Sequence, residues 1–102
     1  MTRREKLQEL LVKQPDDAFL HYGLAIELVK EGEAEAALER FDRVLRLDAG
    51  YSAAHYQKAN TCVALGRLEE ARATLVTGIA AARAKGDAHA EEEMRSFLGS
   101  LG

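Results

Sequence analysis

The stretch HYGLA at residues 21–25 returns as HYQKA at residues 55–59, 34 positions later in a chain of 102 residues. A third histidine, His89, follows after the same interval. Outside these stretches the interval is kept by five more identical pairs: Val29 and Val63, Gly32 and Gly66, Glu35 and Glu69, Ala37 and Ala71, and Ala54 and Ala88. A fixed period of this size indicates an array of helical repeats, each of which forms one supersecondary unit.

Apolar residues at helical spacing predict six helices joined by short turns. A helix that packs against neighbours buries residues three or four positions apart. The predicted core residues, helix by helix, are Leu7, Leu10 and Leu11; Leu20, Leu24, Ala25 and Leu28; Ala37, Phe41, Val44 and Leu45; Ala59, Cys62 and Val63; Ala71, Leu75 and Ile79; and Ala90, Met94, Phe97, Leu98 and Leu101. The pattern predicts an all-α fold, a right-handed α-solenoid of about six helices in antiparallel pairs.

Turn-forming residues separate these helices. The residue before a proline is pushed out of the α region, and glycine adopts the left-handed conformation that ends many helices. The predicted helix ends are Pro15, Gly32, Ala49-Gly50, Gly66 and Gly86, with fraying at Gly99 and Gly102. Short polar side chains cap helix N-termini. The predicted N-caps are Asp16 or Asp17, Ser52 and Asp87.

Composition and charge exclude several functional classes. A net charge of −3 argues against nucleic acid, because proteins that bind phosphate backbones carry a concentrated basic stripe. A single cysteine, Cys62, allows no intramolecular disulfide. The first residues resemble no signal peptide, and no apolar run approaches the roughly 20 residues that cross a bilayer. We therefore expect a cytoplasmic protein with neither nucleic-acid nor membrane partners.

The repeat resembles the tetratricopeptide repeat, whose 34-residue pattern is W-x₂-L-G-x₂-Y for the first helix and A-x₃-F, then P, for the second. Residues 21–28 (HYGLAIEL) and 37–41 (ALERF) fit this pattern, with histidine in place of the aromatic residue. Residues 55–62 (HYQKANTC) and 71–75 (ARATL) fit it more loosely. Pro15 occupies the place of the family's proline one period earlier.

The resemblance extends over the whole chain and predicts its organisation. We expect one domain over residues 1–102, and terminal helices with a more polar outer face. Its parts are a half repeat over residues 1–14, a first repeat over 18–51, a second over 52–85 and a closing helix over 86–102.

The resemblance also implies a concave groove, lined by the first helix of each repeat, that holds an extended or helical peptide. Spacings of three and four place each set of residues on one helical face. Tyrosine is a favoured interface residue, although packing between helices is an equally open interpretation for Tyr22 and Tyr56. The expected groove residues are Phe19, Tyr22, Ile26 and Val29; Ala53, Tyr56, Asn60 and Val63; and Asp87, Ala90 and Met94, with Phe97 as a further candidate.

No constellation in the sequence predicts catalysis, a metal or a cofactor. Equivalent residues of stacked repeats lie about 8–10 Å apart, too far for His21, His55 and His89 to share an ion. We expect each imidazole to fill the family's aromatic packing position, with its polar edge near solvent. Cys62 lies at an apolar helical position and is expected to behave as a small hydrophobe.

Three functional hypotheses follow. The first is a non-catalytic protein–protein interaction module that binds a peptide or partner helix in its groove. The second is a self-associating subunit of a larger assembly, because Phe97, Leu98 and Leu101 could leave apolar surface beyond the last repeat. The third is a histidine-dependent metal or pH-sensing role near the ordinary histidine pKa of about 6.5.

Overall fold

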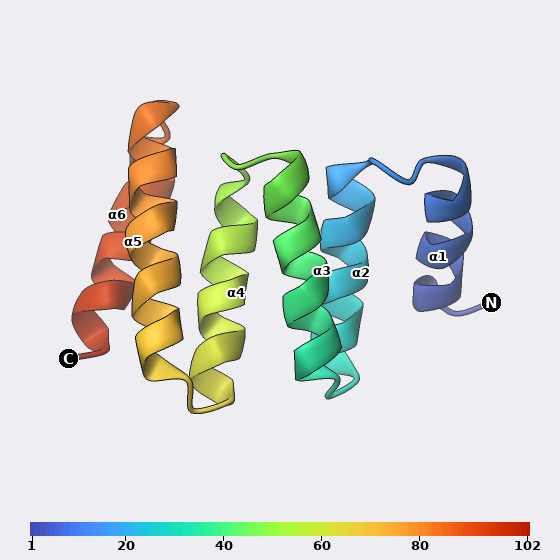
Figure 1. The fold of residues 1–102 in the computed structure, drawn as a ribbon, viewed down its shortest axis with the longest axis horizontal. Coiled ribbons are helices and arrows are strands. Elements are labelled where there is room, and N and C mark those ends of the chain that lie inside the picture. The colour runs from blue at the N-terminus through green and yellow to red at the C-terminus, as the bar shows by residue number, and fades with distance from the viewer. The chain divides into compact units, whose positions relative to one another are not determined.

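A computed structural model describes all 102 residues and contains six α-helices and no strand. Contacts group the helices into two units, Met1–Ala49 with α1 to α3 and Gly50–Gly102 with α4 to α6, here called unit 1 and unit 2. Consecutive helices within each unit run antiparallel (Figure 1). This is the all-α helical-repeat fold that the sequence predicts. The helices are α1 (Arg3–Lys13), α2 (Ala18–Lys30), α3 (Ala34–Leu47), α4 (Ser52–Ala64), α5 (Leu68–Ala84) and α6 (Ala88–Ser100).

Equivalent turns end α2 and α4, as the 34-residue period predicts. Gly32 and Gly66 have φ angles of 79° and 76°, which side chains rarely adopt. The amide of Glu33 donates to the carbonyl of Leu28 at 2.9 Å, and the amide of Arg67 donates to that of Cys62 at 2.8 Å. The predicted stops at Gly32 and Gly66 are therefore confirmed, with the same hydrogen-bonded closure in both units.

The helix N-termini confirm two predicted caps and correct a third. Asp17 accepts from the amide of Leu20 at 3.1 Å, and Asp87 accepts from the amide of Ala90 at 3.1 Å. The prediction for Ser52 is wrong, because this residue lies inside α4 and its hydroxyl donates to the Asp87 carboxylate at 3.2 Å. The hydroxyl donates to a charged acceptor, which forms a stronger hydrogen bond than a neutral acceptor.

The C-terminal helix continues further than its glycine suggests. The prediction of fraying at Gly99 is wrong, since α6 passes through this residue to Ser100. Only Gly102, beyond the helix, has a positive φ, of 91°. Glycine lowers helix stability by about 1 kcal/mol relative to alanine, which packing of the same helix readily offsets.

Each unit has its own buried core. In unit 1 the core is built on Phe41 and Val44 of α3, together with all four residues predicted for α2. The prediction for Leu10 is wrong: it is exposed, because α1 packs mainly through Leu7. In unit 2 the predicted core residues Ala59, Cys62, Ala71, Leu75, Ile79 and Met94 are buried, and Ala54, Ala82 and Gly78 join them.

Close approach of three helices marks the centre of unit 2. A Cβ atom placed on Gly78 of α5 would lie 2.7 Å from His55 Cβ of α4 and 2.7 Å from Met94 Sδ of α6. Real Cβ contacts are longer than this, so only glycine fits here without displacing its neighbours. At Gly78, α4 and α6 therefore both pack against α5. This packing positions the residues of the pocket described next.

Candidate interaction site between α4 and α6

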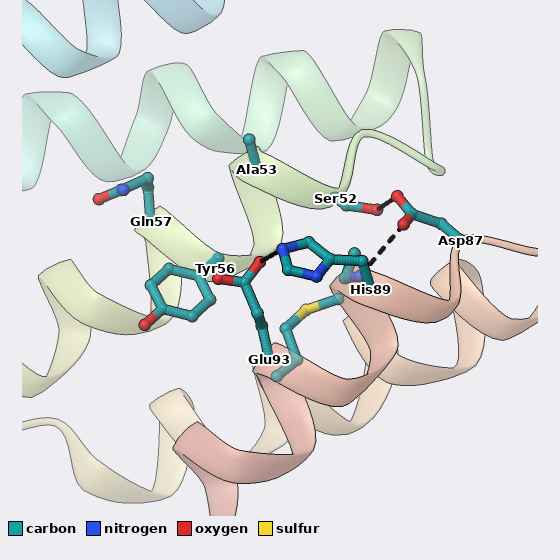
Figure 2. A pocket seen from close by; sticks show the side chains of 9 residues that line it. Ser52, Ala53, Tyr56, Gln57, Asp87, His89 and Glu93 are labelled. Atoms are coloured by element: carbon teal, nitrogen blue, oxygen red, sulfur yellow. Dashed lines mark hydrogen bonds and ion pairs between the residues drawn. The ribbon is translucent and has the colours of Figure 1, made fainter.

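A pocket of about 420 Å³ lies between α4 and α6 in unit 2 (Figure 2). It is open at the surface and has both polar and apolar walls. Its lining residues are Ser52, Ala53, Tyr56 and Gln57 from α4, and Asp87, His89, Ala90, Glu93 and Met94 from α6 and its N-cap. Pockets of this size with a few placed polar groups are the usual form of a binding site.

Apolar side chains form the base of this pocket. Met94 is only 1% exposed and lies where α6 meets Gly78. The ring of Tyr56 packs on that of Phe97 with centroids 5.1 Å apart and an angle of 54° between the planes. Aromatic pairs of this tilted geometry contribute about 0.5–1.5 kcal/mol beyond their buried area. The base is therefore a fixed apolar surface that packs against α5.

The polar end of the pocket is organised by the N-cap of α6. The amide of Ala90 donates to Asp87 and holds the pKa of this carboxyl below its ordinary value of 3.8. The hydrogen bond from Ser52 and the charges of Lys85 and His89 lower the pKa further, against the opposing effect of burial. An ionised carboxylate near a helix N-terminus is also favoured by the helix dipole. Asp87 thus supplies a fixed negative charge that links α4 to α6.

A second pair of side chains forms the exposed rim. His89 Nε2 lies 3.3 Å from Glu93 Oε1, one helical turn away on α6 (Figure 2). The side chain of His89 is 86% exposed and that of Glu93 is 55% exposed. An ion pair this open to solvent contributes little to stability. Both side chains can therefore reorient toward a ligand at small cost.

The structure places five of the predicted groove residues in this pocket: Ala53, Tyr56, Asp87, Ala90 and Met94. Asn60 and Val63, further along α4, do not line it. Ser52, Gln57, His89 and Glu93 line it and were missed by the sequence reasoning. The i, i+4 spacing of His89 and Glu93 was the available signal, since such residues are neighbours on a helix.

Unit 1 carries the corresponding predicted residues on α2. Phe19 is 69% exposed and Val29 is exposed, whereas Tyr22 and Ile26 are half-buried. The Tyr22 ring packs on Phe41 of α3 with centroids 6.1 Å apart, and burial raises the pKa of its hydroxyl. Both tyrosines thus pack on an aromatic ring of their own unit and still keep part of their surface accessible to solvent.

The three histidines have three different environments. His21 Nε2 lies 2.7 Å from the carbonyl oxygen of Pro15, and Arg40 Nη1 lies 3.0 Å from His21 Nδ1. Arginine is always a donor, so Nδ1 accepts and Nε2 donates to the carbonyl. The expectation of a solvent-facing polar edge is therefore wrong for His21, whose polar atoms bond within the protein. His55 is also buried, whereas His89 is exposed.

Cys62 lies fully buried in α4, and burial, followed by the charge of Glu70, raises the pKa of its thiol. Its Sγ donates to Glu70 Oε2 at 3.8 Å. A reactive cysteine needs an environment that lowers this pKa. The environment of Cys62 matches the sequence-based interpretation of a small hydrophobic residue.

Six helices with a 34-residue period define a helical-repeat protein, and an open pocket lies between two of its helices. The family model described as tetratricopeptide repeat matches residues 28–91. The TPR repeat-containing protein PA0015 of Pseudomonas aeruginosa is 37% identical over 97 residues, which cover 95% of this chain and 92% of that protein. The chain belongs to the tetratricopeptide repeat family.

Solved structures show the same fold. The solution structure of a tetratricopeptide repeat domain protein from Salinibacter ruber is 29% identical, with a TM-score of 0.81 over 85% of this chain and 88% of that one. The crystal structure of PcrH in complex with the chaperone binding region of PopD has a TM-score of 0.88 at 20% identity. It covers 96% of this chain and 74% of PcrH, and at this identity the likeness concerns the fold alone.

No helix of the structure combines the length and the apolar character that crossing a membrane requires. The longest helix, α5, has 17 residues and carries charged side chains in its first and last turns.

Proposed function

We propose that the chain binds a peptide or helix of another protein, and that the pocket between α4 and α6 receives an apolar side chain of that partner. Membership of the tetratricopeptide repeat family supports the general role, because its members are generally protein-interaction modules rather than enzymes. PcrH, which shares the fold, is described in complex with the chaperone binding region of PopD. The fold can therefore hold a segment of another protein.

The observation that carries the proposal is the combination of a fixed apolar base with a polar rim. Met94 and Tyr56 line the pocket, Phe97 packs on Tyr56, and Gly78 of α5 lies against α4 and α6. Interfaces typically have this arrangement, in which a buried aromatic or aliphatic centre supplies affinity and the polar rim supplies specificity. Asp87 and Glu93 make the rim acidic and favour a basic or hydrogen-bond-donating residue beside the anchor.

Filling the pocket from its edge tests the proposal without disturbing the core. Ala53 of α4 is exposed and lines the pocket, so Ala53→Arg places a long side chain across it. Ala80 of α5 is also exposed and lies outside the pocket, so Ala80→Arg is the matched control with the same added charge. Both helices tolerate arginine, which has a high helix propensity.

The measurement is affinity purification from native lysate with the wild type and both variants, quantified by mass spectrometry. We expect the wild type and the control variant Ala80→Arg to retain one or more proteins. We expect Ala53→Arg to lose them. The affinity of a recovered partner should then fall at least about tenfold for Ala53→Arg. Equal retention by both variants would remove the α4–α6 pocket from the binding surface.

Self-association is a second candidate, favoured by exposed apolar side chains in unit 1. Val12 is 82% exposed, and Phe19, which is 69% exposed, is the most exposed aromatic residue of the chain. Leu98 and Leu101, on which the sequence-based hypothesis rested, are half-buried, and Phe97 packs on Tyr56. Sedimentation velocity with Phe19→Ser and the wild type tests it. A monomer at high micromolar concentration in both samples counts against self-association.

A further inference from the structure

Four arginines line a second cavity, of about 340 Å³, in unit 1. Arg4 comes from α1, and Arg40, Arg43 and Arg46 come from α3. The last three recur at every third residue, so they occupy neighbouring turns of one helix. The chain as a whole is acidic, with 14 lysines and arginines against 17 aspartates and glutamates. A concentration of four guanidinium groups at one cavity therefore runs against the average charge of the protein.

This cavity is separate from the surface predicted to form the groove. Its apolar part is supplied by Leu24 and Leu28 of α2. These residues follow Tyr22 by two and six positions, which is about 200° and 240° around a helix of 3.6 residues per turn. They therefore lie on the side of α2 opposite to Tyr22. A ligand here would occupy a face that the proposed function leaves unused.

The arginines are not a requirement of the repeat. One period after Arg40, Arg43 and Arg46 the chain has Thr74, Thr77 and Ala80, a list without a single charge. Nevertheless α5 is a continuous helix that packs on α4 as α3 packs on α2. The fold thus forms without a basic surface at these positions, and the arginines of α3 need another explanation.

Intramolecular contacts occupy only part of the guanidinium groups. Arg4 Nη1 lies 2.6 Å from Glu31 and 3.0 Å from Glu33, and Arg43 Nη2 lies 2.7 Å from Asp16. Each of these contacts uses one terminal nitrogen, whereas a guanidinium carries five N–H donors in a planar fork.

The remaining two arginines have no carboxylate partner within the chain. The contact of Arg40 is to the ring of His21. Arg46 is exposed in the last turn of α3 and makes no ion pair. Glu39 is the one carboxylate that lines the cavity. The donors that remain fit acceptors with two oxygens, as carboxylates have.

We propose that this cavity binds an acidic segment of a protein, with its carboxylates on the arginines of α3. Charge complementarity favours an anionic ligand, and the planar fork of the remaining N–H donors favours carboxylates, which have two oxygens. A nucleic acid fits less well, because its backbone carries a phosphate at every nucleotide and would extend past the arginines onto Glu31, Glu33 and Asp16, which a short acidic segment need not reach. The site is independent of the α4–α6 pocket.

The test uses the full ¹⁵N-labelled chain and a blocked hexapeptide, acetyl-Glu-Leu-Glu-Glu-Leu-Glu-amide, followed by amide chemical shifts. A second titration uses the same peptide with glutamine for each glutamate, and a third uses sodium phosphate. We expect saturable shifts at amides of α3 and α1 with the acidic peptide only. Shifts confined to unit 2, no saturation below about millimolar concentration, or the same shifts with phosphate or the glutamine peptide would overturn the proposal.

A matched pair of charge reversals decides whether the arginines of α3 act. Arg46 and Arg83 both lie exposed in the last turn of the third and fifth helices, and Arg83 does not line the cavity. Arg46→Glu and Arg83→Glu change the net charge equally. We expect Arg46→Glu to weaken the peptide about tenfold or more, the size of one hydrogen bond between charged groups, and Arg83→Glu to leave its affinity unchanged. Equal weakening by the two variants would overturn the proposal. Equal melting temperatures confirm that both variants are folded.

Discussion

Units 1 and 2 place the same residue type at equivalent positions and use it differently. In unit 1, His21 bonds to the Pro15 carbonyl and to Arg40, so a buried polar chain joins α3 to the turn before α2. In unit 2 the position of Arg40 is taken by Thr74, and His55 packs with its Cβ against Gly78. A residue repeated in sequence thus keeps its buried place, while its partners, 19 or 23 residues further on, decide its role.

The units also differ in how tightly their helices approach one another. Gly78 of unit 2 stands one period after Val44 of unit 1. Val44 is fully buried and fills its space with its own side chain, whereas Gly78 leaves its space to Met94 and His55. In unit 2, α6 packs closely on α5, and the pocket between α4 and α6 has an apolar base. In unit 1, α1 leaves Leu10 exposed, and a cavity lined by residues of α1, α2 and α3 carries four arginines.

Removing His21 should produce the largest loss of stability. His21→Ala deletes a buried ring and leaves the Pro15 carbonyl and the Arg40 guanidinium without their partner. We expect a loss of about 3 kcal/mol in the free energy of unfolding, from the cavity and the unmade hydrogen bonds together. Urea denaturation followed by circular dichroism measures it.

The matched control is His89→Ala, the same substitution at the exposed one of the three histidines. Its expected effect is within about 0.5 kcal/mol, as for most surface positions. Similar losses for both variants would mean that the polar chain around His21 contributes nothing particular to unit 1. The melting temperature of the wild type, measured from pH 5.5 to 8, tests the pH-sensing hypothesis. A melting temperature that does not change over this range would eliminate it.

The close helix approach in unit 2 should give the next largest effect. Gly78→Ala forces a Cβ atom to within 2.7 Å of His55 Cβ and Met94 Sδ, so α4 or α6 must move. We expect a loss of about 2 kcal/mol, because the strain of overpacking exceeds the gain in helix propensity. The measurement is again the free energy of unfolding in urea.

Gly99→Ala is the control with the opposite sign. Gly99 also lies within a helix, and a Cβ atom there would meet no atom within 4 Å. Replacement should stabilise the chain by up to about 1 kcal/mol through helix propensity alone. If Gly78→Ala also stabilises the chain, the glycine is not needed for the packing of α4 and α6. Units 1 and 2 would then differ in sequence at this position but not in how closely their helices must approach.

The smallest effect concerns the acid side of the stability profile. The folded pKa of Asp87 is lowered, so its stabilisation is fully present above the ordinary pKa of 3.8 and is lost as pH falls through the folded value. Asp87→Asn keeps a capping side chain but removes the charge. We expect the variant to show a shallower loss of stability between about pH 5 and pH 2 than the wild type. Urea midpoints across this range measure the slope.

Glu92→Gln is the control for this slope, because Glu92 is an exposed carboxylate of the same helix without an ion pair. A slope that changes equally in both variants would assign the acid dependence to general charge rather than to the N-cap of α6. In unit 1 the capping carboxylate of Glu5, whose pKa is lowered by the backbone hydrogen bond of Thr2, provides the equivalent measurement at α1.

Features with a local signal could be predicted from the sequence. The six helices, the stops at Gly32, Gly66 and Gly86, and the caps at Asp17 and Asp87 follow from residues within one turn of each other. The role of Ser52 could not be predicted in this way, because its hydroxyl donates to Asp87, 35 residues away. A contact between segments that far apart has no signature in the spacing of neighbouring residues. The single-domain assignment over residues 1–102 stays a prediction.

The candidate site was predicted in part for the same reason. Periodicity placed Ala53 and Tyr56 on one face of α4 and Asp87 and Ala90 on α6, and all four line the pocket. Where a pocket opens depends on which residues of two helices face each other, and this requires their packing. The concave groove over all three first helices and the roles of Asn60, Val63 and the α2 residues stay predictions.

The sequence by itself determined the repeat, the order of the helices and the family, because a 34-residue period and its turn residues act within single helix pairs. Only the tertiary structure decided that His21 is bonded, that Gly78 is a point of contact, and that four arginines share a cavity. These properties depend on distances between side chains from different helices. Packing sets such distances, and the repeat leaves the identities of those side chains open.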